Sequence, residues 1–211
     1  MATYSLLVSV LLGVVSMVAG HGRLIEPPSR VSAWRFGFKT PVDYDDDGWN
    51  CGGVGMQYDR SGGKCGICGD SYPGPRKSEA GGKYAKGVIV RHYKKGQIID
   101  IKVDITANHW GWFEFKLCAN NDVTKPATEA CLNQTLLYLP EHGSTRWSIG
   151  SAVKVYKVKA QLPAGMTCSQ CVLQWKYNAG NSWGTDPDTG RSGIGLGNQE
   201  QFLACADISI S

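Results

Sequence analysis

The chain has 211 residues, a formal net charge of +4 and eight cysteines. Its basic residues are scattered instead of forming one stripe, so nothing indicates nucleic-acid binding. After the first 20 residues, no stretch is long and apolar enough to span a membrane, and we expect no membrane partner. Residues 21–211 suffice for one hydrophobic core, so we expect a single domain acting as a monomer.

Residues 1–20 have the pattern of a secretory signal peptide. An apolar stretch from Leu6 to Val18 is followed by Ala19 and Gly20, which suit the cleavage site. Cleavage after Gly20 would make His21 the first residue of a secreted protein. A terminal histidine offers one metal ion two nitrogens, its free α-amine and its own Nδ1. The alternative is that the cleavage site precedes a histidine by chance.

The region from Gly22 to about Lys83 is rich in Gly, Pro, Asp and aromatic residues and shows little periodicity. We expect a long loop region stapled by disulfides, with a short helix near Pro28–Phe38. Ordered long loops on a rigid scaffold often carry function. Four aromatic residues in this region are candidates for stacking on a ligand at the surface, with burial in the core as the alternative: Trp34, Trp49, Tyr58 and Tyr72.

The eight cysteines all lie after the predicted cleavage site. They are Cys51, Cys65, Cys68, Cys118, Cys131, Cys168, Cys171 and Cys205. The two CxxC pairs would suggest zinc in a cytosolic protein, but an oxidising compartment favours disulfides. The spacing leaves the connectivity open, although Cys118 and Cys131 are a plausible local pair. Asn133 begins the only glycosylation sequon, which indicates a surface loop and a glycoprotein.

Alternation of apolar and polar residues dominates the rest of the chain. It predicts strands over 99–105, 112–117, 173–177 and 202–210. Val153 and Val155 lie on the opposite parity from Tyr156 to Leu162, which predicts a β-bulge near Tyr156. Short strands separated by Gly, Pro and Asn turns predict an all-β fold. We expect an immunoglobulin- or fibronectin-like antiparallel β-sandwich with long disulfide-stapled loops.

His109 is the second metal candidate because it comes just after the predicted strand 99–105, and a strand end is a rigid place for a ligand. With the His21 amine and ring it would give three nitrogens, a set that suits copper better than tetrahedral zinc. The alternative is an ordinary core or surface histidine. His92 and His142 have no supporting context, and we expect both at the surface.

Four motifs together resemble one enzyme family. They are HGRLIEPPSR at 21–30, WNCGG at 49–53, CGICGD at 65–70 and QEQFLACADI at 199–208. The set resembles the lytic polysaccharide monooxygenases, and within them auxiliary activity family fifteen, which is known largely from arthropods. Members are secreted copper enzymes that cut crystalline polysaccharides oxidatively.

The resemblance implies roles for particular residues. His21 and His109 would form the histidine brace around one copper ion. Ala107 matches the small residue beside one axial face of the copper, and Phe202 matches the axial aromatic residue. Many members carry Tyr at this last position, so Phe202 is a departure that closes the site with an apolar ring. Glu200 would lie on the same side as Phe202 and hydrogen-bond a molecule held at the copper, or else face solvent.

The activity implied is oxidative cleavage of β-1,4 links in chitin or cellulose, using an external electron donor and O2 or H2O2 as co-substrate. Two alternatives come from other classes: a non-catalytic chitin- or cellulose-binding protein, and a secreted copper carrier. Oxidised oligosaccharide products would distinguish the enzyme from the binding protein, and affinity for chitin would distinguish both from the carrier.

Overall fold

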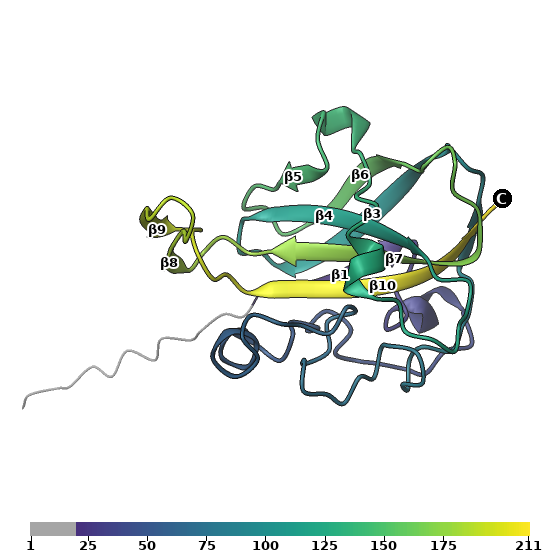
Figure 1. The fold of residues 1–211 in the computed structure, drawn as a ribbon, viewed down its shortest axis with the longest axis horizontal. Helices are drawn as coiled ribbons and strands as arrows, with labels where there is room; N and C mark the ends of the chain where they lie inside the picture. Colours follow the sequence, from purple (N-terminus) through teal and green to yellow (C-terminus); the bar gives the residue numbers. More distant parts are fainter. Residues whose placement is uncertain (1–19) are drawn as a thin grey trace, which may run out of the picture.

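A computed structural model describes residues 20–211 as two β-sheets packed face to face (Figure 1). The predicted signal peptide, apart from Gly20, lies outside the described residues. The first sheet has the order β1-β3-β6, with β1 at His21–Glu26, β3 at Ile98–Ala107 and β6 at Val155–Gln161. The second has the order β2-β10-β7-β4-β5, comprising β2 (Arg91–Tyr93), β10 (Gln201–Ile210), β7 (Cys168–Asn178), β4 (Trp112–Ala119) and β5 (Arg146–Ser148). Neighbouring strands are antiparallel except for β2 and β10. The prediction of an immunoglobulin-like β-sandwich is confirmed.

The hydrophobic core fills the space between the two sheets. Strand β3 buries every second side chain, from Ile99 to Ile105, as its alternating sequence predicts. Strand β4 contributes Phe113, whose ring meets those of Trp175 and Tyr177 on β7 edge-on at 5.6 and 5.2 Å. Edge-to-face contacts of this kind add to the stabilisation from apolar burial. The rigid core therefore supports both strand ends that later carry candidate site residues.

The expected bulge near Tyr156 is wrong. Pairing of β6 with β3 runs without a shift from Gln161 opposite Ile98 to Val155 opposite Asp104. Val153 precedes the strand and is 61% exposed. The change of parity in the sequence therefore marks the beginning of β6, because Val153 lies in the preceding loop and needs no place on the sheet.

The segment between β1 and β2 is the long loop region expected from the sequence, but its expected start at Gly22 is wrong, because residues 22–26 belong to strand β1 and pair with β3. The short helix predicted near residues 28–38 is η1 (Ala33–Phe36), and a second single turn, η2, covers Gly55–Arg60. The loop lies against β10 so closely that a Cβ at Gly69, whose φ is +93°, would be 2.3 Å from the carbonyl oxygen of Leu203. Only glycine fits this close approach.

All eight cysteines form disulfides, so the zinc alternative is wrong. The pairs are Cys51–Cys65, Cys68–Cys205, Cys118–Cys131 and Cys168–Cys171. The predicted local pair is confirmed, and the first two disulfides staple the long loop to itself and to β10. The remaining elements are α1 (Glu129–Leu132), η3 (Pro140–His142) and the hairpin of β8 (Trp183–Thr185) with β9 (Ser192–Ile194). Within residues 20–211, no helix has the length and apolar character needed to cross a membrane.

Candidate metal centre

The two predicted histidine ligands lie close together at one end of the sandwich. His21 begins β1 and pairs with Ala107 near the end of β3, and His109 follows two residues later in the turn to β4. Gly20, which precedes His21, packs on the His109 ring: a Cβ on Gly20 would be 3.0 Å from Nδ1 of His109 and 3.1 Å from the Phe202 ring. The starts of β1 and β10 and the end of β3 therefore meet here (Figure 1).

His109 is held firmly and carries an unpartnered nitrogen. Its backbone N–H donates to the Tyr177 hydroxyl at 2.9 Å, and its carbonyl accepts from the N–H of Gly180 at 2.8 Å. Burial raises the pKa of Tyr177 well above its usual range, so this hydroxyl keeps its proton. The His109 side chain is buried, and among residues 20–211 its Nδ1 has no hydrogen-bond partner. Since a buried nitrogen without a partner is costly, this atom fits a metal ligand.

Glu200 faces His109 and not the solvent. Its Oε2 lies 3.7 Å from Nδ1 of His109 and accepts the N–H of Gly20 at 3.4 Å. Its Oε1 accepts from the side chain of Asn50 at 2.9 Å, and only 12% of the side chain is exposed. The alternative of a solvent-facing carboxylate is therefore wrong. Asn50 was missed as a site residue, because its only sequence signal was its place in the WNCGG motif.

Phe202 covers the inner side of this group. It is buried, with its ring 6.4 Å from that of His21 and stacked on Tyr177 at 5.7 Å. Because a phenyl ring has no donor atom, it bounds the site without offering a ligand. It also connects the site to the aromatic core between the sheets.

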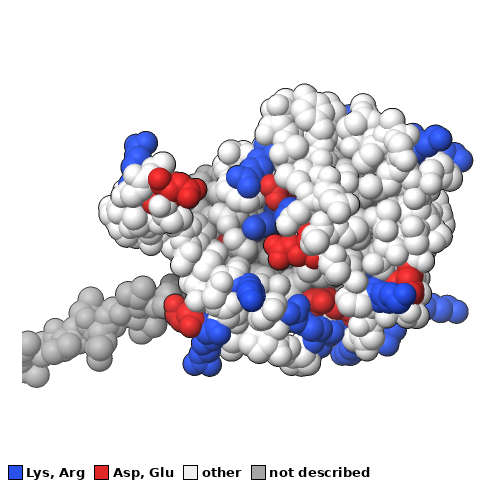
Figure 2. Space-filling model, in the orientation of Figure 1, with Lys and Arg blue, Asp and Glu red and all other residues white. Residues whose placement is uncertain are grey.

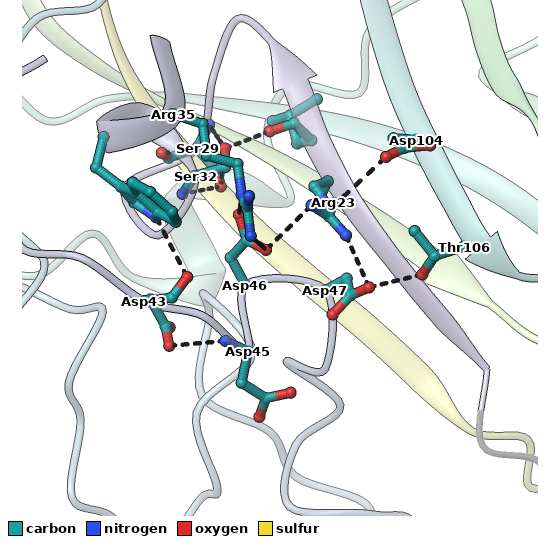
Figure 3. A network of polar contacts seen from close by, with 12 residues as sticks. Arg23, Ser29, Ser32, Arg35, Asp43, Asp45, Asp46, Asp47, Asp104 and Thr106 are labelled. Carbon is teal, nitrogen blue, oxygen red and sulfur yellow. Dashed lines mark hydrogen bonds and ion pairs between the residues drawn. The ribbon is translucent and has the colours of Figure 1, made fainter. Parts of the chain in front are cut away.

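A network of ion pairs anchors the residues directly after His21 (Figure 3). The N–H of Gly22 donates to the carbonyl of Asp47 at 2.9 Å, and Arg23 bonds the Asp47 carboxylate at 2.9 Å. Arg23 also lies 3.4 Å from Asp46 and 3.7 Å from Asp104. We call these contacts of Gly22 and Arg23 with Asp46, Asp47 and Asp104 the β1 clamp. It fixes the start of β1 to the loop around residues 43–47.

The carboxylate of Asp47 stays ionised within this clamp. Partial burial acts to raise its pKa, but hydrogen bonds from Thr106 and Arg23, together with the Arg23 charge, outweigh burial and hold the pKa below its ordinary value. Asp46 is shared with Arg35, whose Nε lies 2.6 Å from Oδ2. Arg35 itself has no described contact with β1.

The four aromatic residues considered as candidates for stacking on a ligand mostly have partners of their own. Trp34 and Trp49 are half-buried and donate to the backbone and side chain of Asp43, and the hydroxyl of Tyr58 donates to the carbonyl of Gln199. Tyr72 is exposed, with the cations of Lys64 and Arg76 over its ring. More exposed aromatic residues were missed by sequence reasoning: Tyr44, Trp110 and Trp183.

The other two histidines lie at the surface, as expected. His92 hydrogen-bonds Ser209, and His142 stacks on Trp147 at 4.6 Å. Within the described part of the chain, no three His, Cys, Asp or Glu side chains are grouped as a metal site. The predicted copper site takes only two such side chains, so this finding does not contradict it.

Comparison with known proteins identifies the family. The family model described as lytic polysaccharide mono-oxygenase, cellulose-degrading, matches residues 21–208. The structure of the lytic polysaccharide monooxygenase AA15 from Thermobia domestica in the Cu(I) state is 45% identical, with a TM-score of 0.86 over 90% of this chain and 98% of that one. A weaker likeness is to LPMO10B from Micromonospora aurantiaca, which is 16% identical with a TM-score of 0.48 over 90% of this chain and 99% of that one. No curated protein sequence matches significantly.

These findings confirm the resemblance inferred from the motifs and favour an enzyme over a binding protein or a copper carrier. The chain belongs to the lytic polysaccharide monooxygenases and is a copper-dependent oxidoreductase of AA15 type.

Proposed function

We propose that this chain is secreted, is cut after Gly20, and oxidatively cleaves β-1,4 links in chitin, in cellulose or in both. Residues 1–20 would be the signal peptide and residues 21–211 a single, monomeric catalytic domain. The match to the family model begins at His21, which agrees with processing at this position. The observation that carries the proposal is the Nδ1 of His109, which is buried beside Gly20 and the start of β1 and has no hydrogen-bond partner among the described residues.

The copper ligands in this proposal are the α-amine and ring of His21 and the ring of His109. Copper supplies one-electron redox chemistry that activates O2 or H2O2, with electrons from an external donor. Removal of Gly20 opens the space beside the His109 ring and frees the amine of His21. The amine has an unperturbed pKa of about 7.7–8.0, so a metal competes with the proton near neutral pH.

The surrounding residues have separate tasks in the proposed reaction. Glu200, oriented by Asn50, accepts a hydrogen bond from a molecule held at the centre and holds it against His109. Phe202 closes the inner side, and Ala107, small and opposite His21, leaves room beside the metal. Trp110, exposed and adjacent to His109, offers a ring on which a sugar of a solid substrate stacks.

Asn133 is proposed as an N-glycosylation site. It is exposed beyond α1, and its Oδ1 accepts from Lys116 at 2.6 Å. A glycan carried on the amide nitrogen leaves this contact in place. Mass spectrometry of the secreted protein before and after glycosidase treatment tests the assignment.

The decisive experiment uses the processed, copper-loaded protein with ascorbate on chitin and, separately, on cellulose. We expect oxidised oligosaccharides by mass spectrometry from at least one of the two. The matched control keeps Gly20 as the first residue, which turns the His21 amine into an amide. We expect this variant to retain the fold and to lose both product formation and tight copper binding. Equal activity of the two forms would contradict the proposed ligand set.

A further inference from the structure

A hollow lies on the outer face of the five-stranded sheet. Outward-facing side chains of β4, β7 and β10 form its floor, and α1 and the loop over residues 62–67 form its walls. Its volume is about 290 Å³. Figure 2 shows a hollow in the middle of this face, with side chains of both charges at its border. We call it the sheet recess.

Lys176 on β7 places a partly buried amine in the sheet recess without an acidic partner. Within residues 20–211 its Nζ makes no hydrogen bond or ion pair, and its described contact is the ring of Trp112 at 5.7 Å. Glu114 pairs with Lys176 in the strand register, but its carboxylate is occupied by Arg146 at 2.9 Å and Lys116 at 3.7 Å. Three cations therefore surround one carboxylate.

The energetics of this arrangement favour an added anion. Burial lowers the pKa of Lys176, and the attraction of Glu114 offsets it only in part. An ammonium removed from water without a counter-charge is costly, so a carboxylate delivered by a ligand would regain both charge pairing and a hydrogen bond. Among the remaining lining residues, Lys64 adds a positive charge and Glu129 a negative one. The net charge of the side chains that line the recess is therefore positive.

The rest of the lining indicates the kind of molecule that carries the charge. Gln174 donates to the carbonyl of Ile67 at 2.6 Å, and its side-chain oxygen has no hydrogen bond among residues 20–211. The peptide groups around Gly62 and Gly63 add polar atoms. Leu132 and Leu203 provide apolar contact. The volume is near the lower end for ligand pockets and exceeds what a bare inorganic anion fills.

We propose that the sheet recess binds a small organic carboxylate with a hydroxylated body about the size of one sugar ring, its carboxylate paired with Lys176. The site is independent of the copper ligands, which lie at the end of the sandwich. A test of this site therefore gives a result that does not depend on the proposed cleavage reaction.

Calorimetric titration of the copper-loaded protein with sodium glucuronate tests this site. We expect saturable binding, at least tenfold weaker binding to Lys176→Met, and no binding of neutral glucose. The matched control is Lys157→Met, which makes the same change at an exposed lysine on β6. Its affinity for glucuronate should equal that of the unmodified protein.

A second measurement distinguishes ligand binding from a structural role of Lys176. If Lys176 stabilised the fold, Lys176→Met would lower the thermal midpoint. Because Lys176→Met removes a partly buried, unpaired charge, we expect its thermal midpoint to stay the same or rise while glucuronate binding falls. If this variant does not fold, Lys176→Gln serves for the same comparison. Absence of glucuronate binding, equal binding to the variant, or binding of inorganic phosphate in preference to glucuronate would each overturn the proposal.

Discussion

The β1 clamp gives the most direct prediction about how the chain holds its first residues. In Arg23→Gln, the 2.9 Å pair with Asp47 and the longer contacts with Asp46 and Asp104 are lost. The Arg23 side chain is only 16% exposed, so these contacts are partly shielded from solvent. A hydrogen bond to a charged group contributes about 1.5–3 kcal/mol, and we expect a loss near 2 kcal/mol. For a domain of this size, that lowers the thermal midpoint by roughly 4–8 °C.

The same substitution is expected to weaken copper binding. Arg23 lies two residues after His21, so its release lets the start of β1 leave the conformation that brings His21 beside His109. Apparent affinity falls with the fraction of molecules in the competent conformation. If about 1.4 kcal/mol of the lost stability is local to this segment, the ratio of released to competent segment rises about tenfold, and the dissociation constant for Cu(II) rises by up to that factor. Calorimetry of the processed protein with Cu(II), supported by paramagnetic resonance spectra, measures this change.

Arg35→Gln is the matched control for the clamp. Arg35 bonds Asp46, as Arg23 does, but contacts neither Asp47 nor β1 among the described residues. We expect this variant to lose stability to a similar degree and to bind copper with unchanged affinity. The reasoning is refuted if both variants lose copper affinity equally, or if Arg23→Gln loses none.

Four further predictions concern single changes. Glu200→Gln removes the charge beside His109 and should lower product formation by about tenfold or more, with a thermal midpoint close to that of the unmodified protein. Phe202→Tyr should change the paramagnetic resonance spectrum of bound Cu(II) more than it changes stability; identical spectra would place residue 202 away from the metal. Asp207→Ala removes the hydrogen bonds at 2.7 and 2.8 Å from the buried guanidinium of Arg30. It should lower the free energy of unfolding, measured in urea, by about 3–5 kcal/mol. The lowered pKa of Lys176 means that the folded state binds fewer protons than the unfolded state just below pH 10.5, so stability from this group rises with pH there. The stability advantage of Lys176→Met should therefore shrink as the pH approaches 10.5, as measured by thermal unfolding across that range.

The strands that form the core could be predicted because one physical rule decides them. In β3, alternate residues from Ile99 to Ile105 face the core, so the apolar residues in the sequence are the ones buried in the structure. The same rule misled at Tyr156, because the valine before the strand, Val153, lies in a loop and contributes to no face. Periodicity reports which side a residue takes only after the limits of the strand are known.

Only those residues of the candidate site that lie beside a local sequence signal could be predicted. His21 follows the predicted cleavage signal, and His109 follows a strong strand pattern, so both could be proposed as ligands from local sequence. The bond between Asn50 and Glu200 and that between Arg23 and Asp47 join positions far apart in the chain. They depend on the path of a loop without periodicity, which local sequence does not determine. The disulfide Cys68–Cys205 was hidden for the same reason.

The residues proposed to border the metal come from distant parts of the polypeptide: His21 opens the first strand, Glu200 directly precedes the last strand and Phe202 lies within it. A ribosome must therefore complete nearly the whole protein before these groups can meet. A fragment that ends before β10 contains both His21 and His109 but lacks Glu200 and Phe202, so it can offer the proposed copper ligands only without the carboxylate and the ring that border them.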